Sequence, residues 1–517
     1  MNGAESLLRS LVASGVDTCF ANPGTSEMHF VAALDRADGM RAVLGLFEGV
    51  VTGMADGYGR MRRSPAVTLL HLGPGLANGL ANLHNARRAS TPIVNVVGDH
   101  ATYHAQYDAP LASDIAGFAA PVSAWIESSR SAETVGADAA RAVQASLAPP
   151  GAIATLILPA DVAWNEAGQH AVAERLPVSA PSTVDESLVS SVIDLLRNGR
   201  RTALLIRGEA LDERGLAAAS RIANATGARV LCDTFTARLR RGAGVAPVER
   251  LPYFAEQLVE SIADVEQLIL VGAASPVAFF AYPGKPSDCV DPRTAVTRLA
   301  EAHDDCVAAL ESVADAFDAQ PTFVDLALAD EPSGRLDQWS IGKVIARHLP
   351  ENAIVSDEGA TNSLGANTAL LTALPHDVLS LTGGSIGQGV PVGAGAAVAC
   401  PDRKVVCLQG DGGGMYTLQT LWTMARESLD TTVVIFANRA YSILQIELNR
   451  TGARELLAEG DRKALSMFDL TNPSLDWVRL AEGMGVEAVS VSSIEAFSSA
   501  FSTAMRERGP RLIEIVL

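Results

Sequence analysis

The stretch "VVCLQGDGGGMYTLQ" (residues 405–419) decides how this sequence is interpreted. An apolar run, Val405 to Leu408, stops at the segment Gly410-Asp411-Gly412-Gly413-Gly414, and a helix-like pattern follows at once. A short apolar run that ends in glycine is typical of a buried strand in a parallel sheet. The segment therefore raises the question of why a carboxylate stands among four glycines at the end of such a strand.

Apolar runs of the same kind recur along the chain, and alanine-rich stretches with helical periodicity lie between them. This alternation predicts an α/β architecture built from βαβ units, with parallel sheets covered on both faces. The predicted strands lie in residues 91–99, 154–159, 202–208, 268–273, 353–359, 404–412 and 431–438.

Two segments without periodicity, 176–187 and 318–338, are rich in proline and polar residues. This composition predicts that they are linkers. They divide the chain into three predicted domains, 1–175, 185–320 and 335–517. The first and the third share a plan, because each has an acidic, glycine-rich turn between a strand and a helix.

The composition and the charge exclude several classes of protein. The 517 residues are 48% hydrophobic and 19% charged, which is ordinary for a globular protein. A net charge of −19 argues against nucleic-acid binding, which requires basic patches. No apolar run approaches the ~18 residues of a membrane span, and no signal peptide is expected from the first residues. Six scattered cysteines fit free thiols, so a cytoplasmic location is expected.

The glycines around Asp411 suggest a phosphate site, because they let backbone N–H groups approach an anion. A lone carboxylate there would repel a phosphate unless a divalent cation lay between them. A second oxygen ligand is expected from the next strand, which ends at Asn438, 27 positions after Asp411. Two alternatives stay open: the glycine segment could be only a tight turn, and Asn438 only a helix N-cap.

This spacing of Gly-Asp-Gly and Asn resembles the signature of thiamine-diphosphate enzymes, and the chain resembles acetolactate synthases and benzoylformate decarboxylases over nearly its whole length. The resemblance implies three doubly wound parallel-sheet domains: the first holds the aminopyrimidine, the third holds the diphosphate and metal, and the middle one is a spacer. It implies Mg²⁺ ligation by Asp411, Asn438 and the carbonyl of Ala440. The family motif commonly carries two asparagines, and here the first is Ala437.

In this family a glutamate of the first domain bonds the pyrimidine ring and promotes loss of the thiazolium C2 proton. Glu48, in "VLGLFEGVVTGMADGYGR" (43–60), matches it. Gly49, Gly53 and Gly57 follow at a spacing of four, so they share a helix face on which another backbone can pack closely, as in a dimer interface. The alternative is that Glu48 only complements a helix dipole.

Other segments match the family's cofactor contacts. Ile386, in "TGGSIGQGVP" (382–391), matches the apolar wedge between the two cofactor rings, and the carbonyl of Gly384 would accept from the 4′-amino group. The segment "SDEGATN" (356–362) matches a loop over the diphosphate. The full set of implied cofactor contacts is Glu48, Gly359, Ala360, Thr361, Gly384, Ile386, Gly410, Asp411, Gly412, Gly413, Asn438 and Tyr441.

Substrate contacts are implied by two segments that match benzoylformate decarboxylase, "FANPGTSEMHF" (20–30) and the run ending at His71. There a hydroxyl residue, here Thr25, and a histidine, here His71, contact the substrate. A purely structural His71 is the alternative, and His100, His104 and Gln106 are either neighbours of the site or surface residues. Residues 271–286 contain no histidine, which speaks against benzoylformate, and no Arg-Phe-Asp-Asp-Arg run, so FAD is not expected.

The sequence thus suggests a thiamine-diphosphate- and Mg²⁺-dependent enzyme that cleaves or forms C–C bonds of 2-oxo acids, similar to acetolactate synthase. Two alternatives stay open: a benzoylformate-type decarboxylase that releases an aldehyde, and a catalytically silent partner subunit. The resemblance also implies a homodimer or homotetramer with active sites between subunits.

Overall fold

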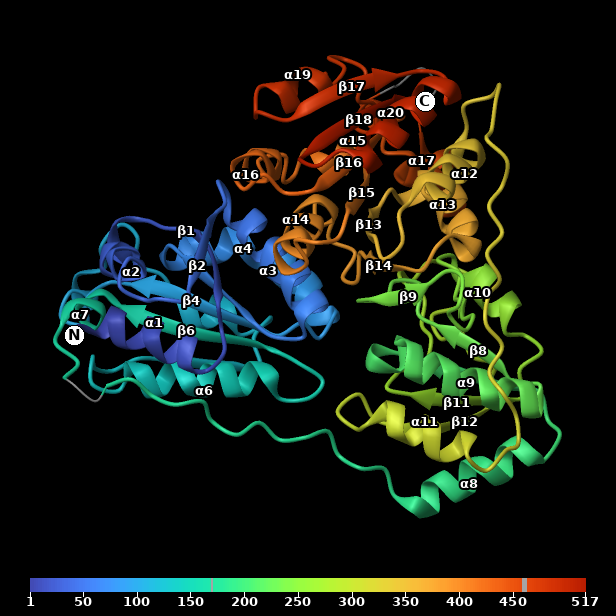
Figure 1. Cartoon of the computed structure of the whole chain (residues 1–517), viewed down its shortest axis with the longest axis horizontal. Helices are drawn as coiled ribbons and strands as arrows, with labels where there is room; N and C mark the ends of the chain where they lie inside the picture. Colours follow the sequence, from blue (N-terminus) through green and yellow to red (C-terminus); the bar gives the residue numbers. More distant parts are fainter. Residues whose placement is uncertain (169–170, 458–462) are drawn as a thin grey trace.

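The protein consists of three α/β units, each built on its own sheet (Figure 1). The computed structural model describes residues 1–168, 171–457 and 463–517. We call the units first (residues 3–164), middle (186–314) and third (338–516). All seven predicted strand segments form strands, which confirms the α/β architecture. The exact domain boundaries at the two linkers stay a prediction.

The first unit has a six-stranded sheet of order β2-β1-β3-β4-β6-β5, in which every pair is parallel. Side chains that alternate along its strands feed two apolar cores, one under α1 and α6 and the other under α3 and α4. The strands are β1 Thr18–Asn22, β2 Arg41–Leu44, β3 Ala66–Leu70, β4 Ile93–Asp99, β5 Trp125–Ser128 and β6 Ile153–Pro159. The helices are α1 Gly3–Ala13, α2 Met28–Leu34, α3 Glu48–Arg62, α4 Leu72–Arg88, α5 Ile115–Ala119, α6 Val135–Leu147 and α7 Ala160–Trp164.

The middle unit has a parallel five-stranded sheet of order β10-β8-β7-β11-β12. Its strands are β7 Thr202–Ile206, β8 Arg229–Cys232, β10 Glu249–Arg250, β11 Gln267–Val271 and β12 Ala295–Ala300. Its helices are α8 Glu186–Arg197, α9 Glu213–Thr226, α10 Ala255–Ser261 and α11 Cys306–Ala314.

The third unit has a seven-stranded sheet of order β17-β18-β16-β15-β13-β14-β9. Its edge strand β9 (Leu239–Arg241) comes from the middle of the chain and pairs antiparallel with β14. The other strands are β13 Ile354–Glu358, β14 His376–Ser380, β15 Val405–Gly410, β16 Thr431–Ala437, β17 Glu487–Val491 and β18 Arg511–Val516. The helices are α12 Gln338–His348, α13 Leu364–Ala369, α14 Gly389–Ala399, α15 Asp411–Gly414, α16 Thr420–Arg426, α17 Ser442–Arg450, α18 Lys463–Ser466, α19 Trp477–Glu482 and α20 Ile494–Arg506.

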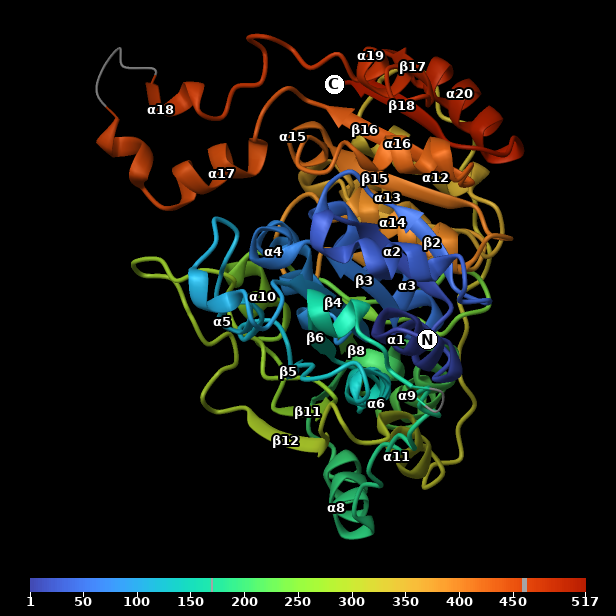
Figure 2. The ribbon, with the colours of Figure 1, turned by 90° about the vertical axis from the view of Figure 1, so that its left-hand side faces the viewer.

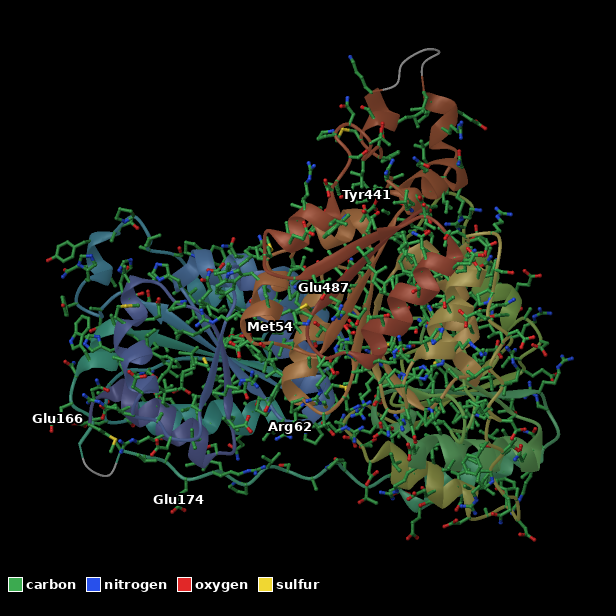
Figure 3. The ribbon with its side chains drawn as sticks, turned by 45° about the horizontal axis from the view of Figure 1, so that its top comes forward. Met54, Arg62, Glu166, Glu174, Tyr441 and Glu487 are labelled. Atoms are coloured by element: carbon green, nitrogen blue, oxygen red, sulfur yellow. The ribbon has the colours of Figure 1, made fainter. Side chains whose placement is uncertain are left out.

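The glycine face of α3 packs on α14 of the same chain. A Cβ added at Gly57 would lie 1.9 Å from the carbonyl oxygen of Val392, and one at Gly395 would lie 1.9 Å from that of Met54. Figure 3 shows Met54 beside the third unit. The close backbone packing that the sequence predicts is confirmed, but the expectation that this face serves a dimer interface is wrong, because α14 fills it.

The chain after β16 leaves the body of the third unit. Figure 2 shows α17 and α18 projecting from the end of the sheet, and Figure 3 labels Tyr441 near the start of this segment. No residue of α17 is buried. Among the described helices, none combines the length and apolar character that a membrane crossing requires.

Candidate active site

The carboxyl ends of β15 and β16 bring Asp411, Asn438 and Ala440 together. The two strands are parallel neighbours, so the turns that follow them lie at the same edge of the sheet. Asp411 Oδ2 accepts a hydrogen bond from the backbone N–H of Arg439 (2.7 Å), the residue between the other two. Asn438 Oδ1 accepts from Ala440 N (3.1 Å), and its Nδ2 donates to Ser442 (2.9 Å). These bonds hold the turn that carries the Asn438 amide next to the turn that carries the Asp411 carboxylate.

The environment of Asp411 fits a cation. Its side chain is buried, with 4% of the residue exposed, and burial raises the pKa of its carboxyl. Within the described residues it forms no ion pair with a basic side chain. A buried carboxylate without a compensating charge is costly. The donor set of one carboxylate, one amide oxygen and one carbonyl oxygen suits a hard cation such as Mg²⁺, which also takes phosphate oxygens.

The turns around Asp411 are shaped by glycines. A Cβ at Gly412 would lie 2.5 Å from the ring of Tyr441, and one at Gly413 would lie 2.7 Å from Glu358. The predicted diphosphate loop follows β13, the neighbour of β15, so Gly359, Ala360 and Thr361 lie at the same edge as Gly410. Of these, Gly359 is buried and Ala360 is exposed with a left-handed φ of 49°.

Glu358 also lies at this edge, and the sequence analysis did not predict a role for it. It is buried and accepts hydrogen bonds from the backbone N–H groups of Gly387 (2.7 Å) and Gly389, and from Gln409 (3.0 Å). Burial raises the pKa of its carboxyl, and these hydrogen bonds oppose the rise. Glu358 thereby joins the ends of β13 and β15 to the loop before α14. Its position at the end of β13, directly before Gly359, was the signal that could have identified it.

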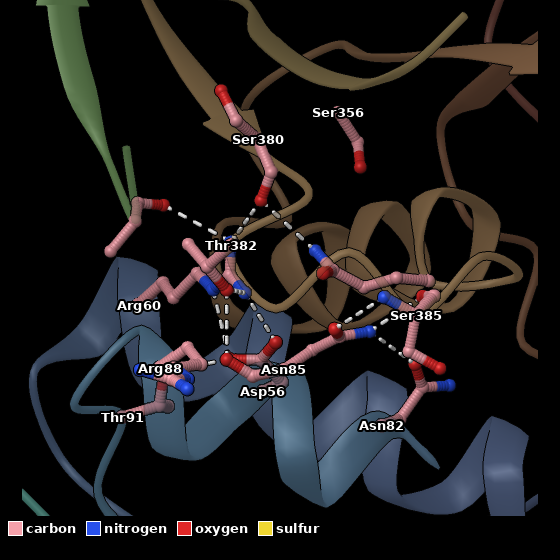
Figure 4. A network of polar contacts seen from close by, with 12 residues as sticks. Asp56, Arg60, Asn82, Asn85, Arg88, Thr91, Ser356, Ser380, Thr382 and Ser385 are labelled. Atoms are coloured by element: carbon pink, nitrogen blue, oxygen red, sulfur yellow. Dashed lines mark hydrogen bonds and ion pairs between the residues drawn. The ribbon is translucent and has the colours of Figure 1, made fainter. Parts of the chain in front are cut away.

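The loop that carries Gly384 and Ile386 is fixed by the first unit. Asn85 of α4 donates to the carbonyl of Ser385 (2.8 Å) and accepts from its N–H (3.1 Å), as Figure 4 shows. The ring nitrogen Nε2 of His84 lies 3.0 Å from the carbonyl oxygen of Gly383. Gly384 itself is exposed with a φ of 75°, and Ile386 is half-buried.

A buried ion pair joins all three units next to this loop (Figure 4). Arg60 of α3 pairs with Asp56 through two hydrogen bonds, and the side chains are 1% and 0% exposed. The Arg60 guanidinium also donates to the carbonyl of Ser380 (2.8 Å), to Thr382 (3.0 Å) and to the carbonyl of Ala237 (3.3 Å). The first unit, the middle of the chain and the third unit therefore meet at one guanidinium.

A second polar cluster lies at the carboxyl edge of the first sheet. Glu48 begins α3, is 7% exposed, and accepts a hydrogen bond at Oε2 from Asn78 (3.0 Å). Glu48 and His71 are neighbours on either side of Gly75. A Cβ added at Gly75 would lie 3.3 Å from Glu48 Oε1 and 3.4 Å from the Cβ of His71. His71 ends the loop after β3 and caps α4. The described hydrogen bonds of Glu48 and His71 stay within the first unit.

The predicted hydroxyl residue Thr25 is exposed and stands at the start of a short turn. Its neighbour Ser26 comes closer to the histidine, with Oγ 3.4 Å from His71 Nδ1. The same nitrogen lies 2.8 Å from Oε2 of Glu27, which is also missing from the predicted site. The rings of His100 and His104 lie 5.4 Å apart, and His104 contacts Tyr107.

We call the cluster at the edge of the first sheet the N-terminal half-site; it consists of Glu48, His71, Thr25, Ser26 and Glu27. We call the cluster at the edge of the third sheet the C-terminal half-site; it consists of Asp411, Asn438, Ala440, Tyr441, Glu358 and the loops 359–361, 384–386 and 410–413.

Comparison with known proteins matches both ends of the chain to one family. The N-terminal binding-domain model of thiamine pyrophosphate enzymes matches residues 1–118, and the C-terminal one matches residues 359–515. A Mycobacterium tuberculosis protein provisionally named acetolactate synthase large subunit IlvX is 52% identical, with 100% of this chain and 99% of that protein covered. Benzoylformate decarboxylase of Pseudomonas aeruginosa is 28% identical, with 97% and 96% covered.

The fold matches solved structures over its whole length. The thiamine-diphosphate-dependent 4-hydroxybenzoylformate decarboxylase of Rhodococcus jostii superposes with a TM-score of 0.85 at 24% identity, covering 100% of this chain and 99% of that one. Benzoylformate decarboxylase of Polynucleobacter necessarius superposes with a TM-score of 0.84 at 20% identity, with the same coverage.

Proposed function

The chain belongs to the thiamine pyrophosphate enzymes, and from this premise we propose that it uses thiamine diphosphate and Mg²⁺ to cleave and form C–C bonds of a small 2-oxo acid. The observation that carries the proposal is the meeting of Asp411, Asn438 and Ala440 around a buried carboxylate without a basic partner in the described chain. The main reaction we propose is acetolactate synthase-like, that is, decarboxylation followed by carboligation, in keeping with the name of the 52% identical relative.

The C-terminal half-site would hold the cofactor. Asp411, Asn438 and the carbonyl of Ala440 would ligate Mg²⁺. The glycines of loops 359–361 and 410–413, with Tyr441, would surround the diphosphate, while Gly384 and Ile386 would contact the rings. Bound there, thiamine diphosphate supplies the electron sink that loss of CO₂ from a 2-oxo acid requires.

The N-terminal half-site would handle protons and the substrate. Glu48 has one oxygen engaged by Asn78, so Oε1 is the atom that can hold a proton for the pyrimidine ring. His71 has Nδ1 engaged by Glu27, so Nε2 is the atom that can give or take a proton. The hydroxyls of Thr25 and Ser26 can donate to a substrate carboxylate.

A decarboxylase that releases an aldehyde is the second candidate. Asn22-Pro23-Gly24, Thr25 and His71 favour it, because these residues resemble the substrate contacts of benzoylformate decarboxylase. A benzoylformate decarboxylase is also among the similar proteins, and a 4-hydroxybenzoylformate decarboxylase is among the matching structures. Residues 271–286 contain no histidine, and their exposed Phe279 and Phe280 contact other aromatic rings, those of Phe235, Tyr253 and Tyr282. This absence favours the acetolactate synthase-like reaction over benzoylformate decarboxylation.

The test is a turnover screen of purified protein with thiamine diphosphate and Mg²⁺. Pyruvate, 2-oxobutyrate and benzoylformate are supplied singly and in pairs, and CO₂ and products are measured. Acyloin acids support carboligation, and aldehydes support the decarboxylase. Cofactor binding without CO₂ release from any 2-oxo acid would support the catalytically silent subunit and contradict both reactions.

We further propose that a functional site combines the N-terminal half-site of one chain with the C-terminal half-site of a partner, so that a homodimer is the smallest active unit. Glu48→Gln and Asp411→Ala, each inactive alone, are mixed after dissociation. Mixed dimers would hold one site with both changes and one with neither, so part of the activity should return. No recovery, with mixed dimers verified by mass spectrometry, would place both halves in one chain.

A further inference from the structure

We propose that Glu27 is a positioning residue for His71: its buried carboxylate holds the Nδ1–H tautomer, so that Nε2 is the nitrogen that exchanges protons with the substrate. The inference rests on the proposed function, because it assumes that His71 contacts a substrate. It deepens that function, because it assigns the tautomer of His71, and therefore the nitrogen that reacts, to the carboxylate of Glu27.

The contacts of Glu27 fix both of its oxygens. Its side chain is 0% exposed, whereas that of His71 is 22% exposed. Oε2 accepts from the backbone N–H of Gly24 (2.8 Å) and lies 2.8 Å from His71 Nδ1. Oε1 accepts from the hydroxyl of Ser26. A carboxylate held by donors on both oxygens cannot turn away from the ring, so the imidazole must direct an N–H toward it.

The space for this pair is made by two glycines. A Cβ at Gly24 would lie 2.1 Å from His71 Nδ1, and one at Gly98 would lie 1.8 Å from Glu27 Oε1. Gly24, His71 and Gly98 lie at the ends of β1, β3 and β4, which are adjacent in the sheet. Any larger residue at either position would displace the ring or the carboxylate, so the contact is built into the sheet edge.

A purely structural role for Glu27 explains only part of this arrangement. The bond from Gly24 N closes the turn at residues 25–27 as a capping box. The carboxylate would not need to face an imidazole for that purpose. With Nδ1 donating to Glu27, Nε2 carries the lone pair and makes no hydrogen bond within the described chain, as a general base requires. The other carboxylate facing His71 is Glu48, across Gly75.

The test compares Glu27→Gln with a matched control, Asp138→Asn. Asp138 lies on α6, away from both half-sites; it is 3% exposed, accepts a hydrogen bond from Ser129 (2.7 Å) and pairs with Arg141 (2.6 Å). We expect Glu27→Gln to keep the fold and the thiamine diphosphate affinity, to lower kcat by roughly 10²-fold, and to leave KM nearly unchanged. Asp138→Asn should leave kcat unchanged. In a His71→Ala background, Glu27→Gln should cause no further loss, because the two residues act as a unit.

A measurement without substrate separates this inference from the proposed function. The ¹⁵N shifts of the His71 ring, assigned by comparison with His71→Ala, report which nitrogen is protonated in the resting protein. Nδ1–H in the wild type and a mixture of tautomers in Glu27→Gln support the inference even if every 2-oxo acid proves inert. Three results would overturn the inference. The first is a proton on Nε2 of His71 in the resting wild type, and the second is an unchanged kcat when Glu27→Gln is made in an active enzyme. The third is a further full loss of kcat when Glu27→Gln is added to His71→Ala.

Discussion

At the edge of the third sheet, backbone amides supply most of the hydrogen bonds to Asp411 and Glu358, whereas at the edge of the first sheet other side chains hold Glu48 and His71. Asp411 accepts from Gly412 N (2.8 Å) and Arg439 N (2.7 Å), and Glu358 accepts from the N–H groups of Gly387 and Gly389. By contrast, Glu48 depends on the amide of Asn78, and His71 on the carboxylate of Glu27.

The two modes of support suit two tasks. Amides in glycine-rich turns are fixed by the chain itself, so the C-terminal half-site presents a rigid set of oxygens and N–H groups to a metal and a diphosphate. Side chains held by other side chains keep a free oxygen or nitrogen and can change protonation, which the N-terminal half-site needs. We therefore expect changes in the C-terminal half-site to alter binding, and changes in the N-terminal half-site to alter rate.

The largest effect should follow from Asp411→Ala. The variant removes the carboxylate of the proposed metal site, so metal-dependent binding of thiamine diphosphate should fall by more than the roughly 10–100-fold typical of an outer-shell change. Calorimetric titration with and without Mg²⁺ measures this. Asp402→Ala is the control, because exposed Asp402 lies just before β15, at its other end. Unchanged affinity in Asp411→Ala would refute the metal assignment.

Glu48→Gln should separate rate from binding. The amide can still hydrogen-bond the pyrimidine ring but cannot exchange a proton, so turnover should fall by roughly 10²–10⁴-fold with every substrate while cofactor affinity is retained. Exchange of the C2 hydrogen of the bound thiazolium for deuterium should slow in parallel. Glu5→Gln is the matched control, since Glu5 is also 7% exposed and pairs with Arg36 in the first unit. Wild-type exchange rates would make Glu48 structural.

Arg60→Leu should destabilise the junction of the three units beside the C-terminal half-site. It leaves Asp56 buried without its cation and removes the contacts to Ser380 and Thr382 beside the Gly384 loop. Loss of one partner of a buried pair costs roughly 3–5 kcal/mol, which urea and thermal unfolding would record. Arg62→Leu is the control, because its side chain is 50% exposed and lies 3.7 Å from Asp17. Equal stability of the two variants would mean that the ion pair contributes nothing.

The smallest effect concerns His376. It is the first residue of β14, and it pairs with Arg241 of the neighbouring strand β9. Burial lowers its pKa from 6.5 to about 4. Between these values the unfolded chain binds a proton that the folded chain does not, so His376 costs stability as pH falls from 6.5 toward 4. The loss reaches up to about 3 kcal/mol. His376→Gln should flatten this part of the stability profile; an unchanged slope would show that His376 titrates normally.

The sequence predicted the features that follow from local patterns. Apolar runs bounded by glycine identified the strands, and the spacing of Asp411 and Asn438 brought two neighbouring strand ends together, because consecutive βαβ strands point the same way. Glu27 and Glu358 were missed because their roles depend on contacts with residues far away in the sequence, His71 and Gly387. β9 was missed because a three-residue strand carries no periodicity, and its pairing with β14 is set by the fold.

The reciprocal contact of α3 and α14 has a consequence for recombination between related enzymes. Gly57 faces the carbonyl of Val392, and Gly395 faces that of Met54, so each helix supplies both a gap and the atom that fills its partner's gap. A chimera cut at the linker 176–187 would pair an α3 from one parent with an α14 from the other. It should assemble only if both parents keep glycine at these positions. The first and third units are therefore best exchanged together, and β9 should be kept with the sheet that it completes.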